Sequence, residues 1–285
     1  MQVRDGRVSV DGGQVWYRLV GLGDTPLVTL HGGPGWPSPS LTPLEALASE
    51  RPVLFYDQLG CGRSDRPDDP ALWSVERFVA ELLAVVDHLG FTRFDLLGHS
   101  WGTMLATEFA LAYPDRIRAM ILASPALSAA RWSADCERLI VAMGDEWERI
   151  YRDAEPSPDD AERLERAFMS RYFCRLDPRP QAMVEASEQF GAQTYLAMWG
   201  PSEYRATGVL RSFDRTADLS ALPHPTLFTC GRHDEATPES TSFYASLMPN
   251  ASVEVFENSA HVAFHEETDR YLEVVGRFLA AQDAS

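Results

Sequence analysis

One stretch of the chain is compatible with few backbone paths. An apolar run from Phe94 to Leu97 leads into Gly98-His-Ser-Trp-Gly102, and a helical pattern continues to about Ala112. A serine at the apex of such a strand-to-helix turn has strained backbone angles, and its neighbours two residues away must lack side chains so that strand and helix do not collide. The turn therefore predicts that Ser100 is a nucleophile and that the Trp101 amide is free at a helix N-terminus to meet an oxyanion.

Strand and helix patterns alternate on both sides of this turn. Alternating residues 8–20 surround Asp11-Gly-Gly13 and predict a hairpin. Ser74 is typical of a helix N-cap, and Gly90 of the residue after a helix. Short apolar runs, typical of buried strands, lie at 26–30, 52–56, 117–123, 225–231 and 252–256, and a last helix is expected over 267–280. This alternation predicts an α/β fold with a mostly parallel sheet flanked by helices.

The segment from about Ala130 to Phe213 has a different pattern. Charged and aromatic residues increase there, the helical patterns are short, and no apolar strand run is visible. Because strand runs resume afterwards, we expect an inserted helical cap over 130–213 and a core made of 1–129 and 214–285.

Three of the predicted strands end in groups that form a hydrolytic triad. Ser100 follows one strand, Asp234 follows the second and His261 follows the third. Carboxyl ends of parallel strands meet at one edge of a sheet, where an imidazole could take the serine proton and a carboxylate could orient the imidazole. Taken singly, Asp234 could cap a helix and His261 could be a core or surface residue. His265 is an alternative base, but it lies where the last helix should begin.

A glycine-rich loop, His31-Gly-Gly-Pro-Gly35, ends the strand predicted to flank the nucleophile. Such a loop can aim the Gly33 amide at the same point as the Trp101 amide, which would form an oxyanion hole with two donors. The alternative is a plain glycine-proline turn.

Composition limits the possible partners. Lys and Arg total 25 against 42 for Asp and Glu, a formal net charge of -17, which argues against nucleic acid and anionic membranes as partners. No apolar run approaches the roughly 18 residues that span a bilayer, and the first residues lack the apolar core of a secretory signal. We therefore expect a cytoplasmic protein. The four cysteines are scattered without a metal-binding spacing, so free thiols, no metal and no organic cofactor are expected.

Together the motifs resemble those of the proline iminopeptidase branch of the α/β-hydrolases, which also contains L-amino acid amidases. They are spread over almost the whole chain: His31-Gly-Gly-Pro-Gly35, Tyr56-Asp-Gln-Leu-Gly60, Gly98-His-Ser-Trp-Gly102, Trp199-Gly-Pro-Ser-Glu203 and Gly231-Arg-His-Asp-Glu235. The resemblance implies the α/β-hydrolase fold and the release of an unblocked N-terminal residue, often proline, from a peptide or amide.

The resemblance further implies that Glu203 and Glu235 bind the free ammonium of the substrate. Elementary electrostatics agrees, because a carboxylate beside the triad repels an oxyanion unless it binds a cation. The alternatives are a solvated Glu203 and a Glu235 that merely begins a helix. Beside Glu203, an aromatic group could wall an apolar pocket or simply pack the cap: Phe190, Tyr195, Trp199 and Tyr204.

Three functions remain open on these grounds. The first is a serine hydrolase that cleaves the amide bond after an unblocked N-terminal L-amino acid, acting on a small-molecule or short-peptide substrate with a free amine. The second is a carboxylesterase or other small-molecule hydrolase that does not recognise the amine. The third is a catalytically silent binding module, against which the intact Ser100, Asp234 and His261 argue. The oligomeric state, the leaving group and the preferred first residue are not predicted.

Overall fold

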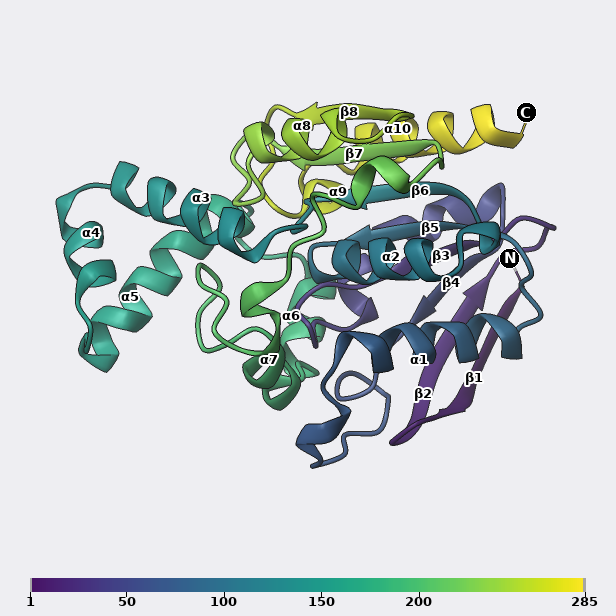
Figure 1. Ribbon diagram of the computed structural model, residues 1–285, viewed down its shortest axis with the longest axis horizontal. Coiled ribbons are helices and arrows are strands. Elements are labelled where there is room, and N and C mark those ends of the chain that lie inside the picture. Colours follow the sequence, from purple (N-terminus) through teal and green to yellow (C-terminus); the bar gives the residue numbers. More distant parts are fainter. Residues whose placement is uncertain (1, 284–285) are drawn as a thin grey trace.

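A computed structural model describes residues 2–283, whose centre is one eight-stranded sheet (Figure 1). The strand order is β1-β2-β4-β3-β5-β6-β7-β8; β1, β2 and β4 pair antiparallel and all later pairs are parallel. The strands are β1 (Val3–Val10), β2 (Gly13–Val20), β3 (Leu27–Leu30), β4 (Val53–Tyr56), β5 (Phe94–His99), β6 (Ile117–Ala123), β7 (Thr226–Gly231) and β8 (Ala251–Phe256). The predicted α/β class is confirmed.

Each face of the sheet has its own apolar core. Successive residues of β5 illustrate this, because Leu96 belongs to one cluster and Leu97 to the other, and both are fully buried. The first cluster includes residues of α1 (Val75–His88), α2 (Trp101–Ala112) and α8 (Pro238–Ser246). The second includes residues of the 3-10 segment Ser38–Ser49, α9 (Ala263–Glu266) and α10 (Thr268–Asp283). Burial on both faces explains why the central strands β3 to β7 are nearly continuous apolar runs.

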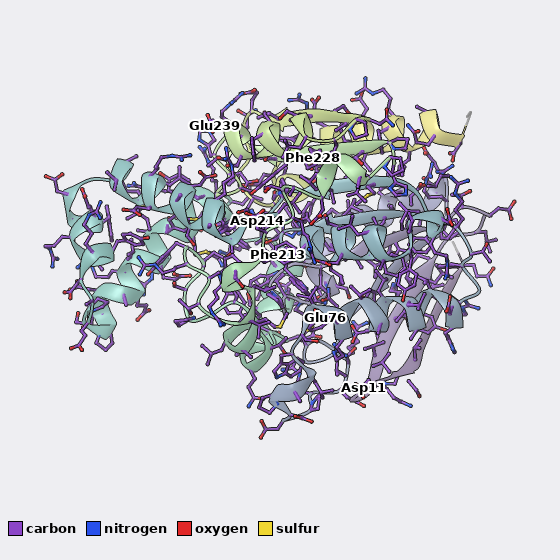
Figure 2. All side chains as sticks on the ribbon, in the orientation of Figure 1. Asp11, Glu76, Phe213, Asp214, Phe228 and Glu239 are labelled. Atoms are coloured by element: carbon purple, nitrogen blue, oxygen red, sulfur yellow. The ribbon has the colours of Figure 1, made fainter. Side chains whose placement is uncertain are left out.

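Two local expectations can be compared with the structure. The Ser74 side chain accepts a hydrogen bond from the Arg77 amide, which confirms the predicted N-cap of α1. The expectation that β8 is a buried strand was wrong, since Phe256 is its one buried residue. Its position at the edge of the sheet leaves the other side chains partly exposed. Phe228 of the neighbouring β7 lies within the core, whereas Asp11 lies exposed at the hairpin tip (Figure 2).

Helices fill the connection between β6 and β7. They are α3 (Ala129–Ala142), α4 (Asp145–Arg152), α5 (Pro158–Phe168), the π-helical turn Met169–Phe173, α6 (Gln181–Glu188), α7 (Ala192–Met198) and two 3-10 turns, Val209–Ser212 and Leu219–Ala221. Figure 1 shows α3, α4 and α5 projecting to one side of the sheet. The two ends of the connection meet in a β-bridge between Ser128 and Asp214. This closure supports the division at 130 and 213, which stays a prediction.

Two observations concern the chain as a whole. Over residues 2–283, helices that combine the length and the apolar character needed to cross a membrane are absent. The four cysteines are free and buried.

Candidate active site

The turn at Ser100 has the strained geometry that its sequence predicts. Ser100 joins β5 to α2 with φ 54° and ψ -120°. A Cβ atom on Gly98 would collide with the Gly102 carbonyl, and one on Gly102 would collide with the Leu30 carbonyl. The glycines thus permit the close approach of strand, helix and flanking loop, and Ser100 is held at the wall of a cavity.

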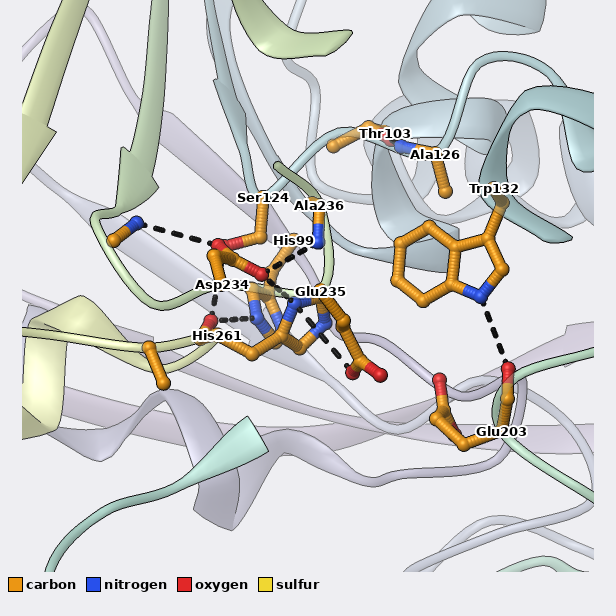
Figure 3. A network of polar contacts seen from close by, with 12 residues as sticks. His99, Thr103, Ser124, Ala126, Trp132, Glu203, Asp234, Glu235, Ala236 and His261 are labelled. Atoms are coloured by element: carbon orange, nitrogen blue, oxygen red, sulfur yellow. Dashed lines mark hydrogen bonds and ion pairs between the residues drawn. The ribbon is translucent and has the colours of Figure 1, made fainter. Parts of the chain in front are cut away.

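Asp234 and His261 form a buried pair beyond the ends of β7 and β8. The Asp234 Oδ1 atom lies 2.7 Å from His261 Nδ1 and also accepts a hydrogen bond from the Ala236 amide at 2.8 Å. Its Oδ2 atom accepts bonds from Ser124 Oγ at 2.7 Å and the Gly231 amide at 3.3 Å (Figure 3). These donors fix the position of the carboxylate, which in turn fixes the orientation of the imidazole.

The remaining nitrogen of the imidazole is unused. His261 Nε2 is buried and has no hydrogen-bond partner within residues 2–283. Rings surround the imidazole, with centroid distances of 5.7 Å to Trp132, 5.4 Å to Phe173 and 4.8 Å to His99. Phe173 lines the large cavity and Trp132 a small cleft, and Ser100 lines both, so the rings that contact the imidazole also border the space beside the serine. No hydrogen bond joins His261 Nε2 to Ser100 Oγ. His265 instead contacts the Ser40 carbonyl at 2.7 Å, outside this arrangement.

His99 contacts the backbone of His261. Its Nε2 atom lies 2.9 Å from the His261 carbonyl oxygen. Burial, together with the nearby imidazole of His261, holds the pKa of His99 well below its usual value. His99 is therefore a neutral donor that positions the backbone of the base.

The two predicted oxyanion-hole amides border one small cleft. Gly33, Ser100 and Trp101 all line it. Neither the Gly33 nor the Trp101 amide donates to another residue of the described chain. Gly33 has φ 106°, a conformation that favours glycine. The arrangement leaves two free donors beside the serine.

Gln58 connects the two segments that carry these amides, and the sequence analysis did not identify it. Its Nε2 atom donates to the His31 carbonyl at 3.2 Å, and its Oε1 atom accepts from the Trp101 indole at 2.8 Å. Its backbone amide also donates to His31 Nε2 at 3.0 Å. Gln58 follows β4 in the motif Tyr56-Asp-Gln-Leu-Gly60, and an amide side chain just after a buried strand was the available signal.

A larger cavity of about 490 Å³ opens beside Ser100. Most of its walls are apolar, and its only carboxylates among the described lining residues are Glu165 and Glu203, with no arginine. The lining residues are Gly32, Gly33, Trp36, His99, Ser100, Glu165, Met169, Phe173, Phe190, Ala192, Tyr195, Leu196, Gly200, Pro201 and Glu203.

Two glutamates face each other beside His261. Glu235 is fully buried, neither of its carboxylate oxygens has a partner among residues 2–283, and Oε1 lies 3.8 Å from His261 Nδ1. Its side chain points toward Glu203 in Figure 3. Glu203 accepts a 2.6 Å hydrogen bond from the Tyr195 hydroxyl. Burial raises the pKa of both carboxyls, and for Glu235 the charge of Glu203 adds to the effect. A cation between them would favour ionisation of both.

The predicted aromatic group is only partly brought to the cavity. Phe190 and Tyr195 line it, and Trp199 lines the small cleft beside Ser100. Tyr204 lines neither, because its ring packs inside the cap against Tyr151 and Phe168 at 5.7 and 5.8 Å.

The cap supplies contacts for which the sequence analysis found no motif. In the π-helical turn that follows α5, the Tyr172 carbonyl accepts from the Glu235 amide at 3.3 Å. The neighbouring Phe173 carbonyl accepts from the His261 amide at 3.0 Å. Glu165, on α5 just before this turn, lines the cavity. These contacts come from tertiary packing, so no local sequence signal marked them.

Metal-binding arrangements of His, Cys, Asp and Glu side chains are not found within residues 2–283. What the site offers is a strained serine, an oriented imidazole, two free amides and a pair of buried carboxylates. Groups of these kinds could attack a carbonyl carbon that lies next to a positive charge.

Comparison with known proteins agrees with this arrangement. The family model for the alpha/beta hydrolase fold matches residues 25–268. A curated proline iminopeptidase of Heyndrickxia coagulans is 43% identical over 96% of this chain and 98% of its own length. The crystal structure of the Mycobacterium smegmatis proline iminopeptidase superposes with a TM-score of 0.91 at 28% identity, over 99% of each chain. The crystal structure of VinJ superposes equally well, at 31% identity over 98% of this chain and 99% of that one. The chain therefore belongs to the proline iminopeptidase family of the α/β-hydrolases.

Proposed function

We propose that this hydrolase cleaves the amide bond that follows an unblocked N-terminal L-amino acid, with proline as the favoured first residue. The observation that carries the proposal is Glu235, whose buried carboxylate has no hydrogen-bond partner among residues 2–283, lies 3.8 Å from His261 Nδ1 and points toward Glu203. An unpaired buried carboxylate is costly, and the ammonium of a substrate would compensate it. The names of the relatives support proline, and the apolar cavity suits its ring.

The roles of the residues follow from their positions. Ser100 Oγ attacks the carbonyl carbon while His261 Nε2 takes its proton, and Asp234 keeps the imidazole oriented. The Gly33 and Trp101 amides bind the oxyanion of the tetrahedral intermediate. Collapse of that intermediate releases the amine, which receives the proton from His261 and leaves an acyl-enzyme. A water molecule, deprotonated by the same imidazole, then hydrolyses the acyl-enzyme and restores the Ser100 hydroxyl.

Ammonium binding would set the position of the cut. With the amine held by Glu203 and Glu235, the first carbonyl of the substrate reaches the serine and later carbonyls do not. The proposal therefore includes exopeptidase or amidase action on small molecules and short peptides. A cytoplasmic location is also proposed, supported by four free, buried thiols.

The test compares L-prolinamide and L-alaninamide with their N-acetylated forms, with a p-nitrophenyl ester as control. We expect turnover of the free-amine amides that is lost on acetylation, and a higher kcat/KM for L-prolinamide. The Ser100→Ala variant provides the blank. Ester cleavage with no dependence on the amine would instead support the carboxylesterase alternative. No labelling of Ser100 by a phosphonate or sulfonyl fluoride would favour a silent binding module.

A further inference from the structure

The space around Ser100 has two unequal parts. The small cleft lies between the Gly33 and Trp101 segments and the indoles of Trp132 and Trp199. The cavity of about 490 Å³ lies beyond it. Ser100, Gly33 and Glu203 line both parts, so a substrate whose carbonyl lies at Ser100 extends into both. The small cleft has room for about one water-sized group, such as the oxyanion, so both the first residue and the leaving group lie in the larger cavity.

The larger cavity carries a carboxylate that the proposed mechanism does not use. Glu165 lines this cavity and is absent from the lining of the small cleft. It forms no ion pair within residues 2–283, unlike its neighbours on α5, Glu162 and Asp160, which pair with Arg166 and Arg163. No arginine lines the cavity to offset it. Any group that binds in this cavity therefore interacts with the negative charge of Glu165.

The position of Glu165 relative to the reacting bond is well fixed. The π-helical turn Met169–Phe173 directly follows α5, and its carbonyls accept hydrogen bonds from the amides of Glu235 and His261. The helix that carries Glu165 is thus tied to the two loops that hold the base and the ammonium-binding carboxylate.

We propose that Glu165 is a specificity residue that selects against leaving groups bearing a free carboxylate near the scissile bond. This inference rests on the proposed function and names its substrate class. When Glu203 and Glu235 bind the one ammonium of the substrate, Glu165, whose carboxylate accepts a hydrogen bond from the Glu203 amide, remains without a cationic partner in the cavity that holds the leaving group. The carboxylate of a free dipeptide would be repelled there, with no arginine in the cavity wall to receive it. Aminoacyl amides, arylamides and peptides with an amidated or more distant C-terminus avoid this repulsion.

Burial and the nearby Glu203 raise the pKa of Glu165 to about 7. The test is therefore made at pH 8, where Glu165 is mostly ionised. It measures kcat/KM for L-prolyl-L-alanine and L-prolyl-L-alaninamide, which differ only at the C-terminal group. For the wild type we expect the amide to be preferred. In Glu165→Gln the preference should shrink about tenfold, chiefly through faster cleavage of the free dipeptide.

The chain offers a matched control on the same helix. Glu162→Gln removes an exposed carboxylate that pairs with Arg166 outside the cavity, and it should leave the amide-to-dipeptide ratio unchanged. Thermal unfolding of both variants checks that they fold. If Glu165→Gln does not fold, the ratio is measured for the wild type at pH 6 and pH 8, because protonation of Glu165 at pH 6 should reduce the preference for the amide.

The outcomes separate this inference from the proposed function. If L-prolyl-L-alaninamide is cleaved only with a free amine but the ratio is the same in wild type and Glu165→Gln, the role of Glu165 is refuted and the proposed function stands. In the pH experiment, a ratio that is the same at pH 6 and pH 8 has the same meaning. If neither compound is cleaved, or acetylation has no effect, the proposed function itself fails.

Discussion

Replacing Gln58 by leucine tests whether side-chain hydrogen bonds hold the amides of the proposed oxyanion hole in place. Gln58 is buried and links the His31 carbonyl to the Trp101 indole, so leucine would leave both groups without a partner. A buried polar group left unsatisfied costs about 1–3 kcal/mol, so two such groups predict a loss of about 2–6 kcal/mol in the free energy of unfolding.

The effect on catalysis has a separate upper bound. The amides of Gly33 and Trp101 belong to the backbone and survive the substitution, so they are displaced and not removed. Complete loss of one oxyanion donor lowers kcat by about 10²–10³. We therefore expect Gln58→Leu to lower kcat about 10- to 100-fold while KM changes little, because the affected contacts exist only in the transition state.

The assay measures kcat and KM on L-prolinamide together with urea unfolding. Thr226→Val is the control, because it removes a buried hydroxyl that bonds the His224 carbonyl at the opposite end of β7 from Asp234. It should lower stability and leave kcat unchanged. A folded Gln58→Leu enzyme with kcat within about twofold of wild type would refute the bracing role.

Two further predictions concern the carboxylates. Glu203→Gln should weaken transition-state binding of free-amine amides by about 2–5 kcal/mol and leave cleavage of a p-nitrophenyl ester nearly unchanged, as read from kcat/KM for the two substrates; equal losses on both would contradict ammonium binding. Because the folded-state pKa of Glu165 is raised to about 7, the native state binds its proton more tightly than the unfolded chain does, so the free energy of unfolding should fall as pH rises from about 4.5 to 7. Urea unfolding measures the free energy of unfolding at pH 5 and pH 8. Between these pH values it should fall by about 2 kcal/mol more in the wild type than in Glu165→Gln, and equal falls would contradict the raised pKa.

Features with a local physical cause could be predicted from the sequence. Strands β3 to β7 are buried on both faces and are therefore nearly continuous apolar runs. The Ser100 turn needs Gly98 for a local reason, because a Cβ atom there would collide with the Gly102 carbonyl, whereas Gly102 is required by the close approach of the Leu30 carbonyl at the end of β3. The Asp234 and His261 loops could be assigned because each follows a strand run, and the structure brings the two side chains to 2.7 Å.

Features that depend on tertiary packing could not be predicted in this way. Glu165 lies on an amphipathic helix whose Leu164 and Phe168 are buried, and its sequence does not distinguish the cavity side from the solvent side. Tyr204 was predicted to line the pocket because it follows Glu203 in the sequence. Its ring instead packs against other aromatic rings of the helical insertion. The partly exposed β8 differs from the other parallel strands because the edge position is a property of the whole sheet.

The contacts between cap and core bear on how such a site can change its specificity. The turn Met169–Phe173 supplies backbone acceptors to the amides of His261 and Glu235, while Glu165 on the preceding helix lines the cavity in which we propose that the leaving group binds. Backbone acceptors do not depend on the side chains at Tyr172 and Phe173, so they constrain the path of the chain more than its sequence. Substitutions at position 165 can therefore alter the charge of the cavity without moving the base. A helical insertion with almost no recognisable motif can thus hold the reacting groups in place and still vary the substrate that reaches them.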